Sequence, residues 1–377
     1  MRNIVICASG SSNWIGGIYY ARNIAFQLAV NEKISSACRI YLYVAREYAG
    51  EFDDLPPSVK VVPVKQLPGK LGSLQKLLFC VMHRAKYVLY RGSKFLRLFG
   101  SKSVNWIPDF QEKYLPEYFS AQEVQARDKS HKSDAVSSEP LVLSSVTALK
   151  DFQKFYGQEK KNVIVMPFVS YIEPIIRNST PADDSRIIQK HGLEGLRYAC
   201  VMNQFWQHKN HTVVIEALRL YYHAHPDSKL VVVFTGKLSD YRNSDYISSI
   251  EAALKAEPLS DHINLLGFIS REEQIIIMKH SEFVIQPSLF EGWGTVVEDA
   301  KVLDKTILLS DIPVHREQKN SKCIMFNPHD PQELADLIAS ETLTAHNDDP
   351  EKGIADMYTR AKEYTGSFAD FLLEGKM

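Results

Sequence analysis

Short runs of apolar residues alternate along the chain with segments whose apolar residues recur every three or four positions. In the first half, Ile4–Cys7 and Val59–Val64 are typical of buried strands, whereas Tyr20, Ile24 and Leu28 fall at helical spacing. Further strands are predicted at residues 39–44, 104–107, 140–144 and 163–165, and a helix at residues 148–156. Strands that alternate with helices predict parallel sheets with right-handed crossover connections.

A second set of alternating elements follows a polar stretch in which Pro174, Pro181 and residues 177–186 predict a connection between domains. Strands are then predicted at residues 198–202, 230–235, 263–266, 283–286 and 307–309, with helices at 212–222, 245–254, 271–279 and 295–303. We therefore predict an α/β fold of two doubly wound domains, at residues 1–170 and 195–355. A linker at 171–194 joins them, and a terminal helix occupies 356–377. The carboxyl ends of the strands, facing a crevice between the halves, are the expected ligand site.

Composition narrows the class of protein. The 377 residues are 45% apolar and 24% charged, which is typical of a folded chain with a sizeable core. The five cysteines form no Cys-x-x-Cys pair, which argues against a zinc ribbon, a redox motif or a disulfide framework. Apolar runs such as Leu77–Met82 are far shorter than the ~20 residues that span a bilayer, and no export signal is visible. These features predict a reduced, cytoplasmic enzyme.

The net charge of −1 conceals an uneven distribution. Between Leu55 and Pro108 there are ten Lys or Arg residues and no Asp or Glu, so 34 basic and 45 acidic residues remain elsewhere. Large apolar residues from Leu74 to Phe99 are interleaved with these charges, a pattern that an anionic membrane surface attracts. A basic, solvated face on an ordinary pair of core helices would explain the pattern equally well. No nucleic-acid motif accompanies the charge, so a nucleic-acid partner is not expected.

The densest chemical signal lies in residues 287–300. It combines a strand end, the carboxylate of Glu291, the Gly292-Trp293-Gly294 turn and a helix that begins at Thr295. Glycines let backbone N–H groups approach a ligand, and a helix N-terminus offers unpaired donors with about half a positive charge. The combination suits the diphosphate of an activated donor, with Glu291 placed to reach a sugar hydroxyl. A tight turn without a ligand is the alternative.

Two adjacent acids follow this turn. Thr295-x-x-Glu298 is a capping-box pattern, in which the glutamate reaches back to the N–H of the cap residue. Asp299 would then be left to accept hydrogen bonds from a ribose diol. An ordinary surface acid is the alternative for each.

The segment resembles glycosyltransferase family 4, in which a Glu within a Pro-Ser-x-x-Glu-Gly-x-Gly pattern is followed, after seven residues, by a second Glu. Pro287, Ser288, Glu291, Gly292 and Gly294 match this pattern in place. By count the second acid falls on Asp299, one residue after Glu298. The resemblance implies the GT-B fold of two facing Rossmann-like domains, with the terminal helix packed across the first.

The resemblance extends to residues 203–211 and to residues 267–270. Lys209 matches the family's lysine, which holds the donor diphosphate, whereas Asn203 stands where relatives often have an arginine. A lysine at a strand end neutralises phosphate charge without a metal. The neighbouring His208 and His211 are expected to start a helix or to pack. Gly267 and Phe268 resemble the loop beside the nucleotide base.

Two segments of the first half also match. Gly16 and Gly17, within residues 13–18, resemble the glycine-rich loop that faces the donor phosphates. Asp109 matches the aspartate of the family's His-Asp segment, with Pro108 at the histidine position. A carboxylate there could hydrogen-bond the transferring sugar or the acceptor hydroxyl. A turn-forming Pro-Asp pair is the alternative.

Taken with the resemblance, the sequence predicts a retaining, metal-independent glycosyltransferase that uses no cofactor besides its nucleotide-sugar substrate. Its acceptor would be a glycan or a lipid-linked sugar, in surface polysaccharide assembly at the inner face of a membrane. The predicted catalytic residues are Asp109, Lys209 and Glu291. A sugar-nucleotide epimerase of similar two-domain fold and a non-catalytic, membrane-associated assembly protein are the alternatives.

Overall fold

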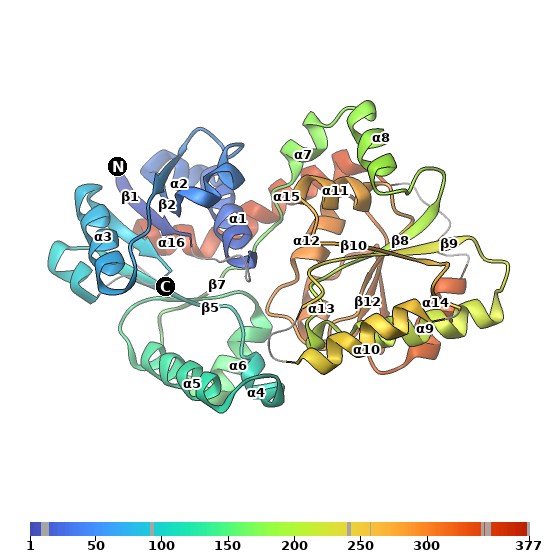
Figure 1. The fold of residues 1–377 in the computed structure, drawn as a ribbon. Coiled ribbons are helices and arrows are strands. Elements are labelled where there is room, and N and C mark those ends of the chain that lie inside the picture. Colours follow the sequence, from blue (N-terminus) through green and yellow to red (C-terminus); the bar gives the residue numbers. More distant parts are fainter. Residues whose placement is uncertain are drawn as a thin grey trace. The chain divides into compact units, whose positions relative to one another are not determined.

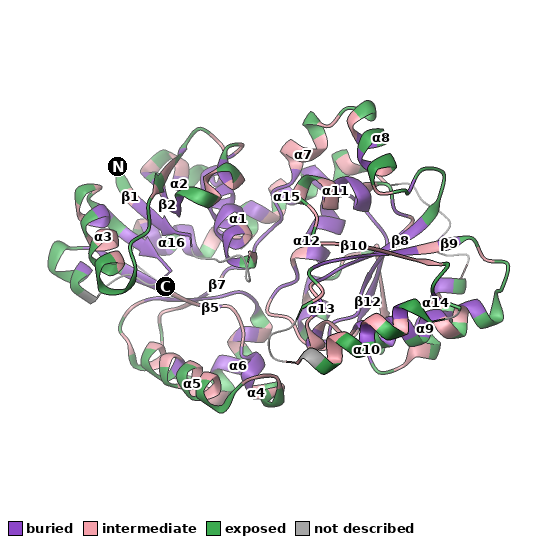
Figure 2. Cartoon of the chain, in the orientation of Figure 1, coloured by how far each residue is buried: buried purple, intermediate pink, exposed green. Residues whose placement is uncertain are grey.

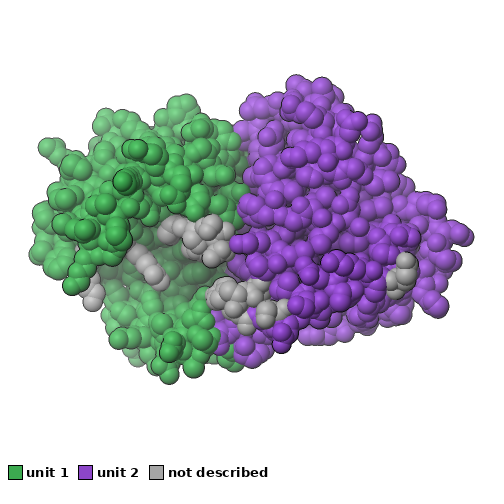
Figure 3. All heavy atoms as spheres, in the orientation of Figure 1, with its two compact units in different colours: residues 1–116, 120–171, 357–377 green, residues 117–119, 172–356 purple. Residues whose placement is uncertain are grey.

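The computed structural model describes residues 1–8, 15–90, 94–239, 243–256, 258–340, 343 and 348–374 (Figure 1). The chain forms two compact units. Unit 1 comprises residues 1–116, 120–171 and 357–377, and unit 2 comprises residues 117–119 and 172–356 (Figure 3). Within the described ranges, no helix has the combination of length and apolar character needed to cross a membrane.

Unit 1 is built on a parallel sheet of seven strands in the order β3-β2-β1-β4-β5-β6-β7. The central strand β1 pairs in parallel with β2 and β4, and its residues Ile4, Val5 and Ile6 have no exposed surface. Burial on both faces explains why this strand is a continuous apolar run. The strands are β1 (Arg2–Cys7), β2 (Cys38–Ala45), β3 (Val59–Val64), β4 (Ala85–Leu89), β5 (Lys102–Ile107), β6 (Leu141–Leu143) and β7 (Val163–Val165).

Helices connect the strands of unit 1. The long ones are α1 (Gly16–Val30), α3 (Gly69–Met82), α5 (Ala121–Val136) and α6 (Val146–Tyr156), and the short ones are α2 (Glu32–Ala37) and α4 (Gln111–Tyr114). Three 3-10 helices, η1 (Arg46–Phe52), η2 (Lys94–Phe99) and η3 (Pro116–Tyr118), complete the described connections. The basic stretch is therefore not a pair of core helices, because strand β4 lies between α3 and η2. Figure 2 shows that the outer face of α5 is exposed, as its polar sequence requires.

The end of the chain returns to unit 1, as predicted. It forms two helices rather than one, α15 (Pro350–Tyr364) and α16 (Gly366–Glu374). The Leu372 carbonyl accepts hydrogen bonds from the Arg2 guanidinium and from the Tyr87 hydroxyl, the latter at 3.1 Å. At the junction of the helices, the buried Asn31 amide donates to the Thr365 hydroxyl at 2.9 Å.

Unit 2 is built on a parallel sheet of six strands in the order β10-β9-β8-β11-β12-β13. The chain winds outward from β8 in one direction and from β11 in the other, so the switch point lies between these two neighbours. The strands are β8 (Arg197–Met202), β9 (Leu230–Thr235), β10 (Ile263–Gly267), β11 (Val284–Gln286), β12 (Ile307–Ser310) and β13 (Cys323–Phe326). The connecting helices are η4 (Gln207–Lys209), α9 (His211–Ala224), α10 (Ser244–Lys255), α11 (Arg271–Lys279), α12 (Thr295–Val302), α13 (Pro313–Gln318) and α14 (Pro331–Ala339).

The stretch predicted as a linker carries two helices, α7 (Glu173–Asn178) and α8 (Pro181–Lys190), both within unit 2. Asp184 of α8 accepts from Lys279 at 2.7 Å and contacts His280 at 2.8 Å, so α8 is fixed to the end of α11. A capping box of Thr180 and Asp183 starts α8 beside Pro181. These contacts make the stretch part of the packed domain.

Candidate active site

Two strand ends meet at the switch point of unit 2. Asn203 directly follows β8, and Gln286 is the last residue of β11. The Asn203 amide donates to Gln286 Oε1 at 2.9 Å, and both side chains are buried. In open parallel sheets ligands bind beyond the carboxyl ends of the strands at this point. The amide pair thus joins the two loops that carry Lys209 and Glu291.

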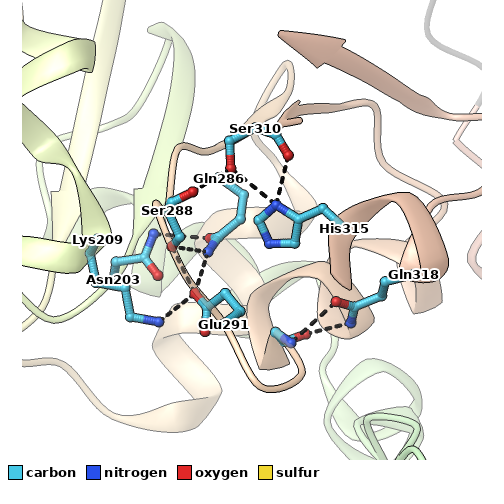
Figure 4. A network of polar contacts seen from close by, with 9 residues as sticks. Asn203, Lys209, Gln286, Ser288, Glu291, Ser310, His315 and Gln318 are labelled. Carbon is cyan, nitrogen blue, oxygen red and sulfur yellow. Dashed lines mark hydrogen bonds and ion pairs between the residues drawn. The ribbon is translucent and has the colours of Figure 1, made fainter. Parts of the chain in front are cut away.

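The Glu291 carboxylate is held by three donors at one oxygen (Figure 4). Its Oε1 accepts from the Lys209 ammonium at 2.6 Å, from the Ser288 hydroxyl at 2.7 Å and from the Gln286 amide at 3.0 Å. Gln286 Nε2 also donates to the Ser288 hydroxyl at 2.9 Å. All three bonds end on Oε1, so within the described part of the chain Oε2 is the oxygen left to accept from a ligand.

The ionisation of Glu291 is determined by its burial and by its contact with Lys209. The side chains of Lys209 and Glu291 are only 15% and 9% exposed. Burial raises the pKa of Glu291, but Lys209, followed by His208 and His315, together outweigh burial and lower this pKa to about 2. Glu291 is therefore ionised at neutral pH. The site presents a cation and an anion in contact at the sheet edge.

The loop that carries Lys209 is shaped by Asn210. This residue has a left-handed backbone with φ of 56°, which asparagine tolerates better than most residues. Its amide donates to the Pro287 carbonyl at 3.1 Å and to the Pro328 carbonyl at 2.8 Å. The Leu289 N–H donates to the His208 carbonyl at 2.8 Å, so the loops after β8 and β11 are tied together directly.

His211 starts α9, as predicted, and packs rather than binds. It has no exposed surface and stacks on Phe205 with ring centroids 4.2 Å apart. Burial lowers its pKa to about 3, so it is neutral at physiological pH.

A second buried histidine supports the loop from the β12 side. His315 Nδ1 lies 2.9 Å from the Ser310 carbonyl, which can only accept, so this nitrogen carries the proton. The Ser310 hydroxyl donates to the Ser288 carbonyl at 2.7 Å. Burial lowers the pKa of His315 to about 4. The neutral histidine therefore braces the chain beside Ser288 (Figure 4).

The start of α12 differs from the predicted capping box. Gly294 is the N-cap residue, and no side chain caps it. Gln318 instead binds the Gly294 peptide from α13: the Gly294 N–H donates to its Oε1 at 3.1 Å, and its Nε2 donates to the Gly294 carbonyl at 2.8 Å. A Cβ at Gly294 would lie only 3.3 Å from the Gln318 oxygen. The first backbone N–H groups of α12 directly follow this turn. Like those at the start of any helix, they have no acceptors within the helix itself.

The two acids after the turn are both buried and ion-paired. Glu298 Oε1 accepts from Lys301 at 2.9 Å and from Gln318 at 3.0 Å, which corrects the capping-box prediction. Both oxygens of Asp299 bind the Arg271 guanidinium, with Oδ2 at 2.7 Å. The ribose contact predicted for Asp299 stays a prediction, and in this structure Arg271 would share the carboxylate with it.

Gly267 ends β10, and the exposed Phe268 follows it. The Gly236 N–H at the end of β9 donates to the Gly267 carbonyl at 2.8 Å. Gly236 has φ of 127°, and a Cβ there would lie 2.1 Å from the Asn203 carbonyl. A glycine is therefore required beside Asn203.

The candidate residues of the first half belong to unit 1. Gly16 and Gly17 form the first turn of α1, whereas Asn13 and Trp14 of the same segment lie outside the described residues. Asp109 follows β5 and accepts from the Gln111 N–H at 3.0 Å, and burial raises its pKa. Their predicted contacts with donor and acceptor, and the predicted crevice, stay predictions.

Several residues of the site were missed from the sequence: Gln286, Ser310, His315 and Gln318 around the loop, and Arg271 opposite Asp299. Gln286 carried a usable signal, because a polar residue at the end of an apolar strand falls at the ligand edge of the sheet. The remaining residues contact the site from elements that are distant in the sequence, so no local sequence pattern identifies them.

Known proteins resemble this chain in sequence and in fold. Residues 183–351, which include Lys209 and Glu291, match the model of the family described as glycosyl transferases group 1. The matched residues make up most of unit 2. The O-antigen chain mannosyltransferase RfbU of Salmonella typhimurium is 26% identical over 156 residues of the chain. That match covers 41% of this chain and 40% of the mannosyltransferase, so the chain aligns with less than half of this relative.

Two solved structures each resemble 98% of the chain. Anabaena Alr3699/HepE in complex with UDP and glucose superposes with a TM-score of 0.64 at 16% identity, covering 98% of this chain and 95% of that one. WaaG, a glycosyltransferase involved in lipopolysaccharide biosynthesis, has a TM-score of 0.62 at 14% identity, with 98% and 99% covered. The two parallel α/β domains and these likenesses confirm the predicted GT-B fold.

Proposed function

We propose that the chain is a retaining, metal-independent glycosyltransferase of family 4 that transfers a sugar from a nucleotide diphosphate sugar to a glycan or lipid-linked acceptor. Surface polysaccharide assembly is the proposed setting, since the matched relative is an O-antigen mannosyltransferase. The observation that carries the proposal is the buried contact of Lys209 with Glu291 at the switch point, beside the start of α12.

The positive groups of this site suit the leaving diphosphate. As the bond between the anomeric carbon and the phosphate oxygen breaks, negative charge grows on the diphosphate. The Lys209 ammonium and the N–H groups at the start of α12 stabilise that charge. Preorganised donors of this kind are each worth roughly 3–4 kcal/mol of transition-state stabilisation in enzymes.

The carboxylate of Glu291 positions the sugar. Lys209, Ser288 and Gln286 hold Oε1, so Oε2 accepts a hydrogen bond from a sugar hydroxyl without the carboxylate having to turn. The acceptor hydroxyl attacks the anomeric carbon from the face that the diphosphate leaves, and its proton passes to the departing phosphate oxygen. Asp109 accepts a hydrogen bond from the transferring sugar or from the acceptor.

The test is donor turnover by variants with matched controls. Lys209→Ala is compared with Lys229→Ala, an exposed lysine just before β9, and Glu291→Gln is compared with Glu272→Gln, an exposed glutamate of α11. UDP-glucose and GDP-mannose serve as donors. We expect kcat/KM to fall at least about a hundredfold in each site variant and to stay at the wild-type level in both controls. Wild-type turnover in either site variant would refute the assignment.

Two further measurements address the chemistry. Nuclear magnetic resonance of the product should show the donor's anomeric configuration retained, and EDTA should leave turnover unchanged. Incubation with donor alone separates transfer from epimerisation, because an epimerase converts the donor without an acceptor. Epimerised donor in that incubation would contradict the proposal.

A further inference from the structure

Exposed large apolar side chains are concentrated in one short part of unit 1. Fifteen such residues occur among the described residues, and eight of them lie between Leu67 and Phe99. We name these eight the α3–η2 surface: Leu67, Leu71, Leu74, Leu78, Met82, Phe95, Leu98 and Phe99.

Helix α3 is apolar on the side that faces solvent. Leu71, Leu74, Leu78 and Met82 follow one another at intervals of three or four residues and are 51–72% exposed, so they share one outward stripe. Cys80, half a turn from Leu78, is buried and packs into the core. A surface helix normally carries polar residues on its outer side, so this exposed apolar stripe indicates an interaction site.

The stripe continues onto the 3-10 helix η2. Leu96 of η2 is buried in the same apolar cluster as Phe79 and Cys80 of α3, which fixes the two elements side by side. Phe95, Leu98 and Phe99 around it are 57–79% exposed. The exposed residues of both elements therefore belong to one region of unit 1.

The charge of this region is positive. The stretch from Leu55 to Pro108 has ten basic residues and no acidic one, and Arg97 is the one described member with an ion pair, to Glu139. A cavity of about 290 Å³ beside the surface is lined by Arg84, Lys86 and Phe99. Apolar side chains next to cations fit lipid tails next to anionic headgroups.

We propose that the α3–η2 surface docks the protein on an anionic lipid bilayer, with the leucine stripe and the phenylalanines of η2 among the outer acyl chains. The positive charge of the surface favours an anionic bilayer over a second copy of the chain as its partner. A second copy of the chain would bring like charges together across a symmetric contact, which disfavours self-association. The inference stands on exposure and charge in unit 1 and does not depend on the proposed transfer reaction.

The test is co-sedimentation of the full chain with vesicles, without a nucleotide sugar. We expect binding to vesicles of phosphatidylcholine with 30% phosphatidylglycerol and none to phosphatidylcholine alone. Leu71→Gln/Leu74→Gln/Leu78→Gln should weaken partitioning at least about tenfold, because each leucine contributes burial of apolar area. The control is Leu220→Gln in α9, which is 38% exposed outside the surface and should bind as wild type.

Charge is tested with a second matched pair. Lys70→Gln/Lys86→Gln should weaken partitioning by roughly 30-fold, whereas Lys129→Gln/Lys150→Gln, which removes two exposed lysines elsewhere in unit 1, should not. All substituted side chains are solvent-accessible, and an unchanged unfolding midpoint verifies folding. Equal binding to both vesicle types, no binding by the wild type, or a dimer that the triple leucine variant abolishes would each overturn the proposal.

Discussion

The charge state of Glu291 yields a prediction that needs no substrate. Replacing Glu291 by Gln preserves its shape and leaves an oxygen for the three donors that now bind Oε1, but removes the negative charge. The variant therefore isolates the electrostatic contribution of the carboxylate. Because Lys209 keeps its charge without a counter-ion, unit 2 should lose stability.

The magnitude follows from the two pKa values. Burial raises the pKa of Glu291, but Lys209, His208 and His315 together outweigh burial, so the folded protein holds this pKa at about 2 against an ordinary 4.5. A lowered pKa stabilises the fold at pH values above 4.5, and that stability is lost as the pH falls toward 2. At pH 7 the contribution is about 3 kcal/mol, and at pH 3.5 it is about 2 kcal/mol.

The assay is urea unfolding followed by tryptophan fluorescence, since Trp206 and Trp293 lie in unit 2 beside the site. We expect the free-energy gap between wild type and Glu291→Gln to shrink by more than about 1 kcal/mol between pH 7 and pH 3.5. Glu272→Gln, on the exposed side of α11, should show no such change. A gap that stays constant or widens in acid refutes the ionised, lysine-paired state of Glu291.

Two other substitutions test the supports of the site. Arg271→Leu should destabilise unit 2 by about 3–5 kcal/mol, because it removes the guanidinium that both oxygens of the buried Asp299 bind. Arg271→Leu/Asp299→Leu should recover most of that loss in urea unfolding. Recovery by less than half would contradict the pairing. Gly236→Ala should cost more than about 2 kcal/mol, since its Cβ would lie 2.1 Å from the Asn203 carbonyl; a wild-type unfolding midpoint would contradict this.

The sequence predicted most of the sheet architecture, because buried parallel strands are apolar runs that need no partner to be recognised. Strand β4 (Ala85–Leu89) was missed, since it follows the apolar helix α3 closely and differs little from it in composition. Helices α7 and α8 were taken for a linker because each contains a proline near its start. Pro174 and Pro181 occupy first-turn positions, where proline is compatible with a helix.

The sequence named Lys209 and Glu291 as candidate site residues but did not predict that they contact each other. Lys209 and Glu291 were each identified from a local motif, yet their contact joins positions 82 residues apart and depends on β8 lying next to β11. The predicted capping box does not form, because Gln318 from another helix binds the Gly294 peptide and also donates to Glu298. Such contacts between elements leave no trace in local spacing.

A crystal structure of the protein with a nucleotide diphosphate sugar tests the central claim most directly. The account predicts a diphosphate oxygen within hydrogen-bond distance, roughly 3 Å, of the Lys209 ammonium, with the N–H groups at the start of α12 on the same diphosphate. It also predicts a sugar hydroxyl bound to Glu291 Oε2. A donor whose diphosphate contacts neither Lys209 nor the α12 N-terminus would contradict it.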